Sequence, residues 1–171
     1  MCGFVGFTNY INNSNIVLEN MMNKIIHRGP DSGGTYIDDG IALGFRRLSI
    51  IDLAQGDQPI LNEDGSKFNG EIYNFQSIRE KLIAAGHKFK TKTDSEVLLH
   101  GYEEYGKNLL NMLRGMFAFV IWDKNTKELF GARDFFGIKP LYYSLSGKSF
   151  LFGSEIKSFL PHPHFKKEMN E

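Results

Sequence analysis

The stretch from Met116 to Trp122 constrains the fold more than any other part of this chain. All seven of its residues are apolar, so an extended strand built from them is apolar on both faces. A strand at a surface alternates apolar and polar residues instead, because one face meets water. We therefore predict a strand buried between two layers of structure.

Other strands are predicted towards both ends of the 171-residue chain and helices towards its middle. The predicted strands are residues 4–7, 36–37, 41–45, 129–132, 141–145 and 150–153, with a hairpin turn at Asp38-Asp39-Gly40. The predicted helices are residues 15–27, 75–86, 93–105 and 154–160, the first capped by Asn12, Asn13 or Ser14 and the third by a capping box. Residues 27–34 are rich in turn formers and predict a loop. Because the helices come in pairs, the pattern favours an α+β fold with helix-covered antiparallel sheets over a doubly wound parallel sheet.

Length and composition limit the number of domains, the classes of binding partner and the cellular compartment. A length of 171 residues fits one domain, and 20 basic against 20 acidic residues leave no electrostatic basis for binding nucleic acid or an anionic membrane. Cys2 is the single cysteine, which excludes an internal disulfide framework and fits a reducing compartment. The chain has no apolar run of transmembrane length and no secretory signal, so we expect a cytoplasmic protein.

Cys2 is the first candidate catalytic residue because of its position. If Met1 is removed, one residue carries both a thiol and a free α-amine. Such an amine titrates near pH ~8, so it can accept the thiol proton at neutral pH, as in enzymes with an N-terminal threonine nucleophile. The alternative for a lone terminal cysteine is an accidental or small buried apolar residue.

A series of motifs then extends along nearly the whole chain in order. They are Met1–Gly6, His27–Asp31, Arg47–Asp52, Asn69–Asn74, Thr93–Glu96, Gly115–Phe119, Arg133–Asp134, Gly137–Tyr143 and Ser154–Lys157. Together they resemble class II glutamine amidotransferases, and within that class the glutaminase half of asparagine synthetases. The resemblance implies an N-terminal-nucleophile hydrolase fold, a four-layer αββα sandwich of two antiparallel sheets. It implies a glutaminase domain over residues 1–160, with the polar tail 161–171 starting a linker to a synthetase domain.

The same resemblance implies a site and a reaction. Cys2 attacks the side-chain amide of L-glutamine, ammonia leaves, and water releases glutamate from the thioester. The Asn69 side chain and the Gly70 backbone N–H hold the oxyanion, which is worth about 3–4 kcal/mol of barrier per donor in other enzymes. For Asn69-Gly70 alone, the alternative is a hairpin turn.

Free glutamine is a zwitterion, so its site needs a cation and an anion. Arg47 suits the carboxylate because a guanidinium binds it bidentately, and Asp94 suits the ammonium with help from Glu71. By the resemblance, the backbone of Leu48, Ser49, Ile50 and Ile51 lines the substrate slot. The alternatives are a solvated or paired Arg47, and an Asp94 favoured only by its place in a first helical turn.

Other polar residues are assigned structural roles. Arg28-Gly29-Pro30-Asp31 is interpreted as a loop near the nucleophile in which His27 packs or forms hydrogen bonds. Arg133, Asp134 and Lys139 are interpreted as a buried polar network or an interface to a partner domain. Only Phe68 is apolar directly before Asn69, where the family has a longer apolar strand, so we expect a shortened strand there.

Three short segments imitate ligand sites without completing one. Residues 32–36 begin like a pyrophosphate loop, residues 146–149 end like a phosphate loop, and His162-Pro163-His164 is too little for a metal site. We therefore expect no metal and no cofactor in this domain, with ATP and Mg²⁺ serving only the synthetase domain.

The expected partners are L-glutamine and that synthetase domain, and the sequence leaves a homodimer open. The main hypothesis is a glutaminase that supplies ammonia for ATP-dependent amidation, as in asparagine synthesis. The alternatives are a non-catalytic glutamine-binding or interaction domain, and an N-terminal-nucleophile amidase acting on another amide.

Overall fold

The computed structural model describes residues 2–9, 11–48, 60–61 and 65–168, and for residues 60–61 and 65–69 it describes the backbone alone. The chain divides into two compact units, residues 1–48 with 140–171 and residues 49–139. Each unit contains one sheet, and the strand pairs of both sheets are antiparallel. Two antiparallel sheets with helices confirm the predicted α+β class.

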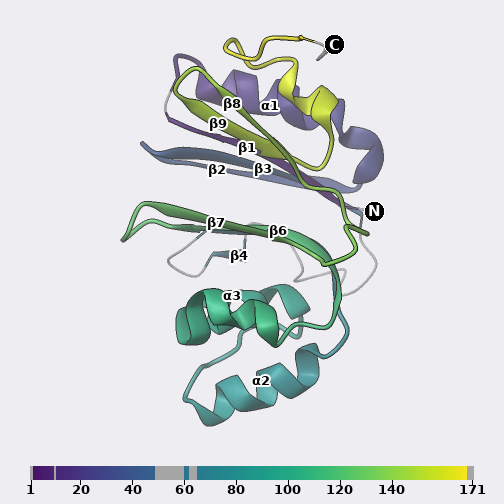
Figure 1. Ribbon diagram of the computed structural model, residues 1–171, viewed down its shortest axis with the longest axis vertical. Coiled ribbons are helices and arrows are strands. Elements are labelled where there is room, and N and C mark those ends of the chain that lie inside the picture. Colours follow the sequence, from purple (N-terminus) through teal and green to yellow (C-terminus); the bar gives the residue numbers. More distant parts are fainter. Residues whose placement is uncertain (1, 10, 49–59, 62–64, 169–171) are drawn as a thin grey trace. The chain divides into compact units, whose positions relative to one another are not determined.

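The first unit is built on a five-stranded sheet with the N-terminal strand at its centre. Across the sheet the strands are β2 (Ser32–Ile37), β3 (Ile41–Arg47), β1 (Gly3–Thr8), β9 (Ser149–Gly153) and β8 (Tyr142–Ser146). The helical elements are α1 (Ser14–Lys24) and the 3₁₀ turns η1 (Ile26–Arg28) and η3 (Ile156–Phe159). In Figure 1, α1 covers one face of this sheet. Because β1 pairs with β3 from Gly3 onward, the residue before it, Cys2, lies beside the C-terminal end of β3.

The core of this unit lies between β1 and α1. Val5 and Phe7 pack with Leu18 and Met21, and all four side chains are fully buried. Burying an apolar side chain of this size contributes roughly 1.5–3 kcal/mol, so these contacts fix β1 against the helix.

The second unit contains the buried strand that the sequence predicts. Its sheet has the order β4 (Ile60–Leu61), β5 (Gly65–Ile72), β6 (Gly115–Asp123) and β7 (Glu128–Arg133). Its helical elements are α2 (Phe75–Ala84), α3 (Asp94–Tyr105) and the 3₁₀ helix η2 (Gly106–Asn111). Both α-helices lie on one face of the sheet, with α3 next to it (Figure 1). Every residue from Phe117 to Trp122 is buried and Met116 is half-buried, which confirms a buried strand over most of this stretch.

Several local predictions are wrong at the ends of elements. No side chain caps α1, since Asn13 has a left-handed φ of 61° and the Ser14 hydroxyl donates to the Ile11 carbonyl. Residues 32–34, predicted as loop, form the start of β2 and pair with residues 45–47 of β3. Ladder hydrogen bonds to β3 outweigh the turn preference of these small residues.

The capping box predicted at Thr93–Glu96 does not form. Thr93 is the N-cap residue of α3 but makes no side-chain cap. The Glu96 carboxylate instead accepts the backbone N–H groups of Lys90 and Thr91, each at 2.7 Å. Glu96 therefore fixes the loop before the helix, not the first turn of the helix itself.

Asn69 lies inside a strand, with four strand residues before it. β5 pairs with β6 from Gly65 to Ile72, with Asn69 opposite Ala118 and Gly70 opposite Phe117. Asn69-Gly70 is therefore part of a strand, which excludes the hairpin alternative. Among the described residues, no helix combines the length and the apolar character needed to cross a bilayer.

Candidate active site

The nucleophile candidate lies directly before β1, against the end of β3. The Cys2 Sγ is 3.4 Å from the Leu48 backbone nitrogen, which donates a hydrogen bond to it, and 3.5 Å from the Leu48 carbonyl oxygen. Gly3 pairs with Arg46 in the antiparallel ladder, so the residues that follow Arg46 lie next to Cys2, which precedes Gly3. These contacts with the Leu48 backbone fix the position of the sulfur.

Arg28 holds the backbone of Cys2. Its Nε donates to the Cys2 carbonyl oxygen at 3.1 Å, and its Nη1 lies 3.2 Å from Glu155 Oε1. Gly3 permits this arrangement, since a Cβ there would lie 2.9 Å from the Arg28 Cδ. Arg28 is therefore a positioning residue for the nucleophile, as the interpretation of its loop as structural implies.

Glu155 is a residue to which the sequence assigned no role. Its carboxylate contacts Arg28, His27 Nε2 at 2.9 Å and Lys157 Nζ at 3.0 Å. Burial alone would raise the pKa of Glu155, but hydrogen bonds from Lys157, Arg28 and His27 outweigh burial and hold the pKa below its ordinary value. The sequence did indicate this residue through the Ser154–Lys157 motif, but the position of that motif in the chain did not link Glu155 to Cys2.

The loop after His27 is packed against β3 at a position where only glycine fits. A Cβ on Gly29 would lie 2.3 Å from the Arg46 carbonyl carbon and 2.4 Å from the Arg47 nitrogen. The Asp31 N–H donates to the Arg47 carbonyl at 3.2 Å. The loop thus fixes the strand end that carries Arg47.

Ser154 holds β1 from its other side. Its hydroxyl oxygen accepts the Phe4 N–H at 3.0 Å, and its own N–H donates to the Phe4 carbonyl at 2.9 Å. Ser154 is fully buried. The backbone that follows Cys2 is therefore held by β3 on one side and by Ser154 on the other.

Part of the predicted substrate-binding segment belongs to this unit. Arg47 ends β3 and is buried, and Leu48 contacts the Cys2 sulfur. Ser49, Ile50 and Ile51 lie outside the described residues. The first unit thus brings Cys2, Arg47 and Leu48 together.

The second unit brings together Gly70, Glu71 and Asp94. The Asp94 carboxylate accepts the N–H of Ile72, the residue after Glu71, at 3.0 Å. Burial raises the pKa of Asp94 and the Glu71 charge adds to this effect, while the N–H groups of Ile72, Asp94 and Ser95 oppose it. Two neighbouring carboxylates suit a bound ammonium group, because the cation relieves both the burial cost and the repulsion.

Gly70 occupies a position that admits no side chain. Its φ is +155°, and a Cβ would lie 2.1 Å from the Met116 carbonyl oxygen and 2.7 Å from the Phe117 Cα. Gly115 on the facing strand is similar, with a Cβ that would lie 2.2 Å from the Glu71 carbonyl oxygen. The side chain of Asn69 lies outside the described residues, so its predicted role stays a prediction.

Asp134 organises the loop after β7. Its carboxylate accepts the N–H groups of Ile138 and Lys139, each at 2.9 Å, and of Phe117 at 3.3 Å. Burial alone would raise the pKa of Asp134, but these backbone donors outweigh burial and hold the pKa below its ordinary value. Arg133 donates to the carbonyls of Gly137 and Lys139. Asp134 and Lys139 are buried, as a buried polar network requires, whereas Arg133 is exposed.

The two segments that imitate phosphate loops are ordinary β structure. Residues 32–36 belong to β2. Residues 146–149 form a tight hairpin in which Ser146 pairs with Ser149 and Gly147 has a φ of +63°. A glycine at the first central position is typical of a type II′ hairpin turn.

Comparison with known proteins settles the family. Residues 1–171 match the family model described as a glutamine amidotransferase domain. The chain belongs to this family. It is 48% identical over 168 residues to an asparagine synthetase [glutamine-hydrolyzing] 1 of Bacillus subtilis, covering 94% of this chain and 27% of that protein. It is 43% identical to an asparagine synthetase [glutamine-hydrolyzing] 2 of Arabidopsis thaliana, covering 92% of this chain and 28% of that protein.

Solved structures share the fold of this glutamine amidotransferase domain. A glutamine phosphoribosylpyrophosphate amidotransferase from B. subtilis matches with a TM-score of 0.76 at 22% identity, covering 92% of this chain and 43% of that chain. A second structure, described as the allosteric regulatory enzyme of purine biosynthesis, matches with a TM-score of 0.79 over 94% of this chain and 43% of that chain. These matches confirm the predicted N-terminal-nucleophile type of fold. The domain spans about a quarter of the length of the asparagine synthetases it resembles.

Proposed function

We propose that this domain hydrolyses L-glutamine to glutamate and ammonia with Cys2 as the nucleophile. The observation that carries the proposal is the contact between the Cys2 sulfur and the Leu48 N–H, directly after Arg47, in a chain that matches the glutamine amidotransferase family throughout. Removal of Met1 gives Cys2 the α-amine that serves as its base.

The reaction proceeds in two stages. The amine takes the thiol proton, and the thiolate attacks the side-chain amide carbon of glutamine. The Asn69 side-chain amide and the Gly70 N–H stabilise the resulting oxyanion. The protonated amine gives its proton to the leaving nitrogen, ammonia departs, and a thioester remains. The amine then takes a proton from water, whose oxygen attacks the thioester and releases glutamate and free Cys2.

The proposed binding groups hold both charged ends of the substrate. Arg47 pairs with the α-carboxylate, and the backbone of Leu48 to Ile51 lines the slot. Asp94 and Glu71 receive the α-ammonium. Burial raises the pKa of Asp94 in the free domain. A bound ammonium group has the opposite effect on this pKa, so it favours the charged carboxylate that binds it.

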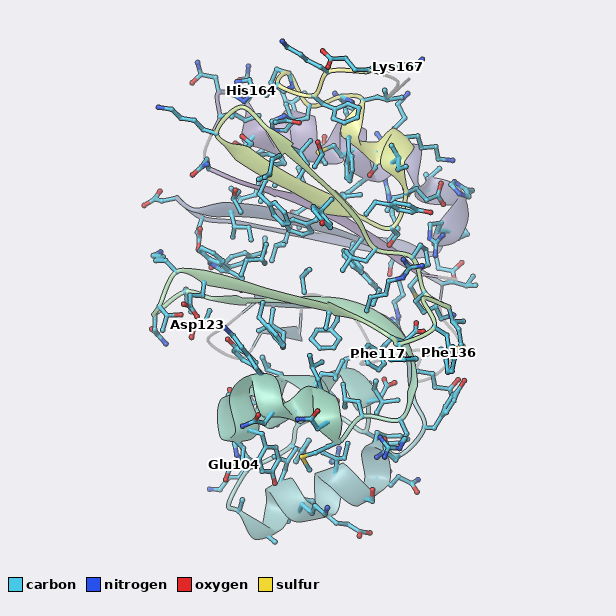
Figure 2. All side chains as sticks on the ribbon, in the orientation of Figure 1. Glu104, Phe117, Asp123, Phe136, His164 and Lys167 are labelled. Carbon is cyan, nitrogen blue, oxygen red and sulfur yellow. The ribbon has the colours of Figure 1, made fainter. Side chains whose placement is uncertain are left out.

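We further propose that the ammonia serves ATP-dependent amidation by a synthetase domain, as the names of the relatives suggest. Residues 1–160 form the glutaminase, residues 161–171 begin the linker, and ATP with Mg²⁺ acts only in the synthetase domain. The loop held by Asp134 suits contact with that domain, because Phe135 is 96% and Phe136 84% exposed. Figure 2 labels Phe136 on this loop. A reactive Cys2 requires a reducing compartment, which supports a cytoplasmic location.

Glutamate and ammonia release by wild type and by Cys2→Ala tests the proposal, with Met1 removal verified by intact mass. We expect turnover by the processed wild type and none by the variant, with the same circular dichroism spectrum for both. Activity retained in Cys2→Ala contradicts the proposal. Glutamine binding without turnover in the processed wild type would support the non-catalytic alternative instead.

A further inference from the structure

The second unit brings together two histidines and a glutamate that belong to none of the sequence motifs. His87 follows the C-terminal end of α2, while His100 and Glu103 lie three residues apart on α3 and so face the same side. The two Nδ1 atoms are 3.3 Å apart. Glu103 Oε2 lies 2.7 Å from His100 Nδ1 and 3.5 Å from His87 Nδ1.

We propose that His87, His100 and Glu103 bind a divalent transition-metal ion, with zinc as the best fit. Zn²⁺ binds nitrogen and carboxylate oxygen at about 2.0–2.2 Å with tetrahedral geometry, which places neighbouring ligand atoms ~3.3 Å apart. The three observed separations scatter around that value. They define a circle of about 1.9 Å radius, so a point just off its plane lies at zinc–ligand distance from all three atoms.

A further carboxylate lies near the outer nitrogen of each ring, and one of them is at hydrogen-bond distance. His87 Nε2 is at hydrogen-bond distance, 3.1 Å, from Glu104 Oε2, whereas His100 Nε2 is 3.6 Å from Glu96 Oε1 and makes no hydrogen bond. Figure 2 labels Glu104 on α3. Metal-binding histidines commonly direct their other N–H towards a carboxylate, as His87 does towards Glu104, which leaves the inner nitrogen free to bind the ion.

Without a cation, the same cluster has to share protons. Two Nδ1 atoms at 3.3 Å can be neither both protonated nor both bare without repulsion, so one ring donates to the other or to Glu103. This hydrogen-bonded cluster is the alternative to metal binding. The Glu96, Glu103 and Glu104 carboxylates favour the dication, because each supplies negative charge next to a ring nitrogen of His87 or His100.

Burial gives the site a closed side and an open side. His100 is only 6% exposed, and the Phe89 ring packs against it with centroids 4.7 Å apart. The side chains of His87 and Glu103 are 17% and 34% exposed, which gives an ion an entry path and leaves its fourth position to water. A bound ion would join the chain after α2 to α3 and stabilise their packing. This proposal replaces the expectation that the domain holds no metal.

Zinc titration of the full chain tests the proposal independently of glutamine hydrolysis. A Cys2→Ser background removes the N-terminal thiol as a competing ligand, and a chromophoric chelator reports the affinity. We expect one zinc ion per chain, and a Tm higher by about 5–10 °C at a zinc concentration ~100 times the Kd. Co²⁺ in place of zinc should give the visible absorption of a tetrahedral site.

Variants of the ligands locate the ion. His87→Gln and Glu103→Gln, both at partly exposed positions, should weaken zinc binding at least ~100-fold, and Glu104→Gln ~10–100-fold. His164→Gln, at an exposed histidine of the other unit, is the matched control and should leave the affinity unchanged. The proposal is overturned if the Cys2→Ser chain binds no stoichiometric zinc, or if zinc binds equally well to His87→Gln and Glu103→Gln.

Discussion

Gly70→Ala should be among the most destabilising single substitutions in this domain. The added Cβ would lie 2.1 Å from the Met116 carbonyl oxygen, which is backbone and cannot rotate away, and φ at this residue is +155°. Backbone strain of this kind costs about 1–3 kcal/mol, and an overpacked contact about 1–3 kcal/mol more. We therefore expect a loss of about 4 kcal/mol from the free energy of unfolding, out of a typical total of about 5–15 kcal/mol.

Urea denaturation followed by circular dichroism measures this loss, with Gly131→Ala as the matched control. Gly131 lies on β7 of the same sheet, and a Cβ there would make ordinary contacts of 3.4 Å with Val120 and 3.6 Å with the Phe119 carbonyl oxygen. Gly131→Ala should change the free energy of unfolding by less than about 1 kcal/mol. If Gly70→Ala is no more destabilising than Gly131→Ala, β5 and β6 do not approach each other as described.

Two further predictions concern charge. Because burial raises the pKa of Asp94, its contribution to stability is fully present below the ordinary 3.8 and is lost as the pH rises through the raised pKa. Asp94→Asn should therefore raise the free energy of unfolding at pH 7 by about 0.5–2 kcal/mol while increasing the KM for glutamine ~10-fold or more, and a less stable variant would contradict this. The lowered pKa of Glu155 has the opposite sign, so its contribution is present above the ordinary 4.5 and is lost as the pH falls through the lowered pKa. Glu155→Gln should lower the free energy of unfolding by about 1 kcal/mol at pH 7, and a deficit that persists undiminished in acid would refute the ionic origin.

The elements of the fold were largely predictable because their signals are local. The continuous apolar stretch of β6 and the helical spacing of Leu18, Met21 and Met22 each identify an element without outside information. Predictions were wrong where the local structure depends on a hydrogen-bond partner that is not adjacent in the sequence pattern. Glu96 bonds the loop before its helix, and residues 32–34 form a strand because β3 pairs with them.

The candidate site was predictable through its motifs, but its supporting contacts were not. Cys2 and Leu48 are 46 positions apart, and Arg28 and Glu155 are 127 apart, so no spacing rule connects either pair. His87 and His100 were missed for the same reason, since only the packing of α2 on α3 brings them together. A motif indicates which residues matter, whereas the contacts that orient them depend on the fold.

The most direct test of Cys2 as the nucleophile is mass spectrometry of the domain quenched in acid during glutamine turnover. We predict a glutamyl adduct on the N-terminal peptide that begins at Cys2, released by hydroxylamine as expected for a thioester, and absent from Cys2→Ala. Glutamate release by the processed protein without any adduct on that peptide, even when water attack is slowed, would contradict the proposed mechanism.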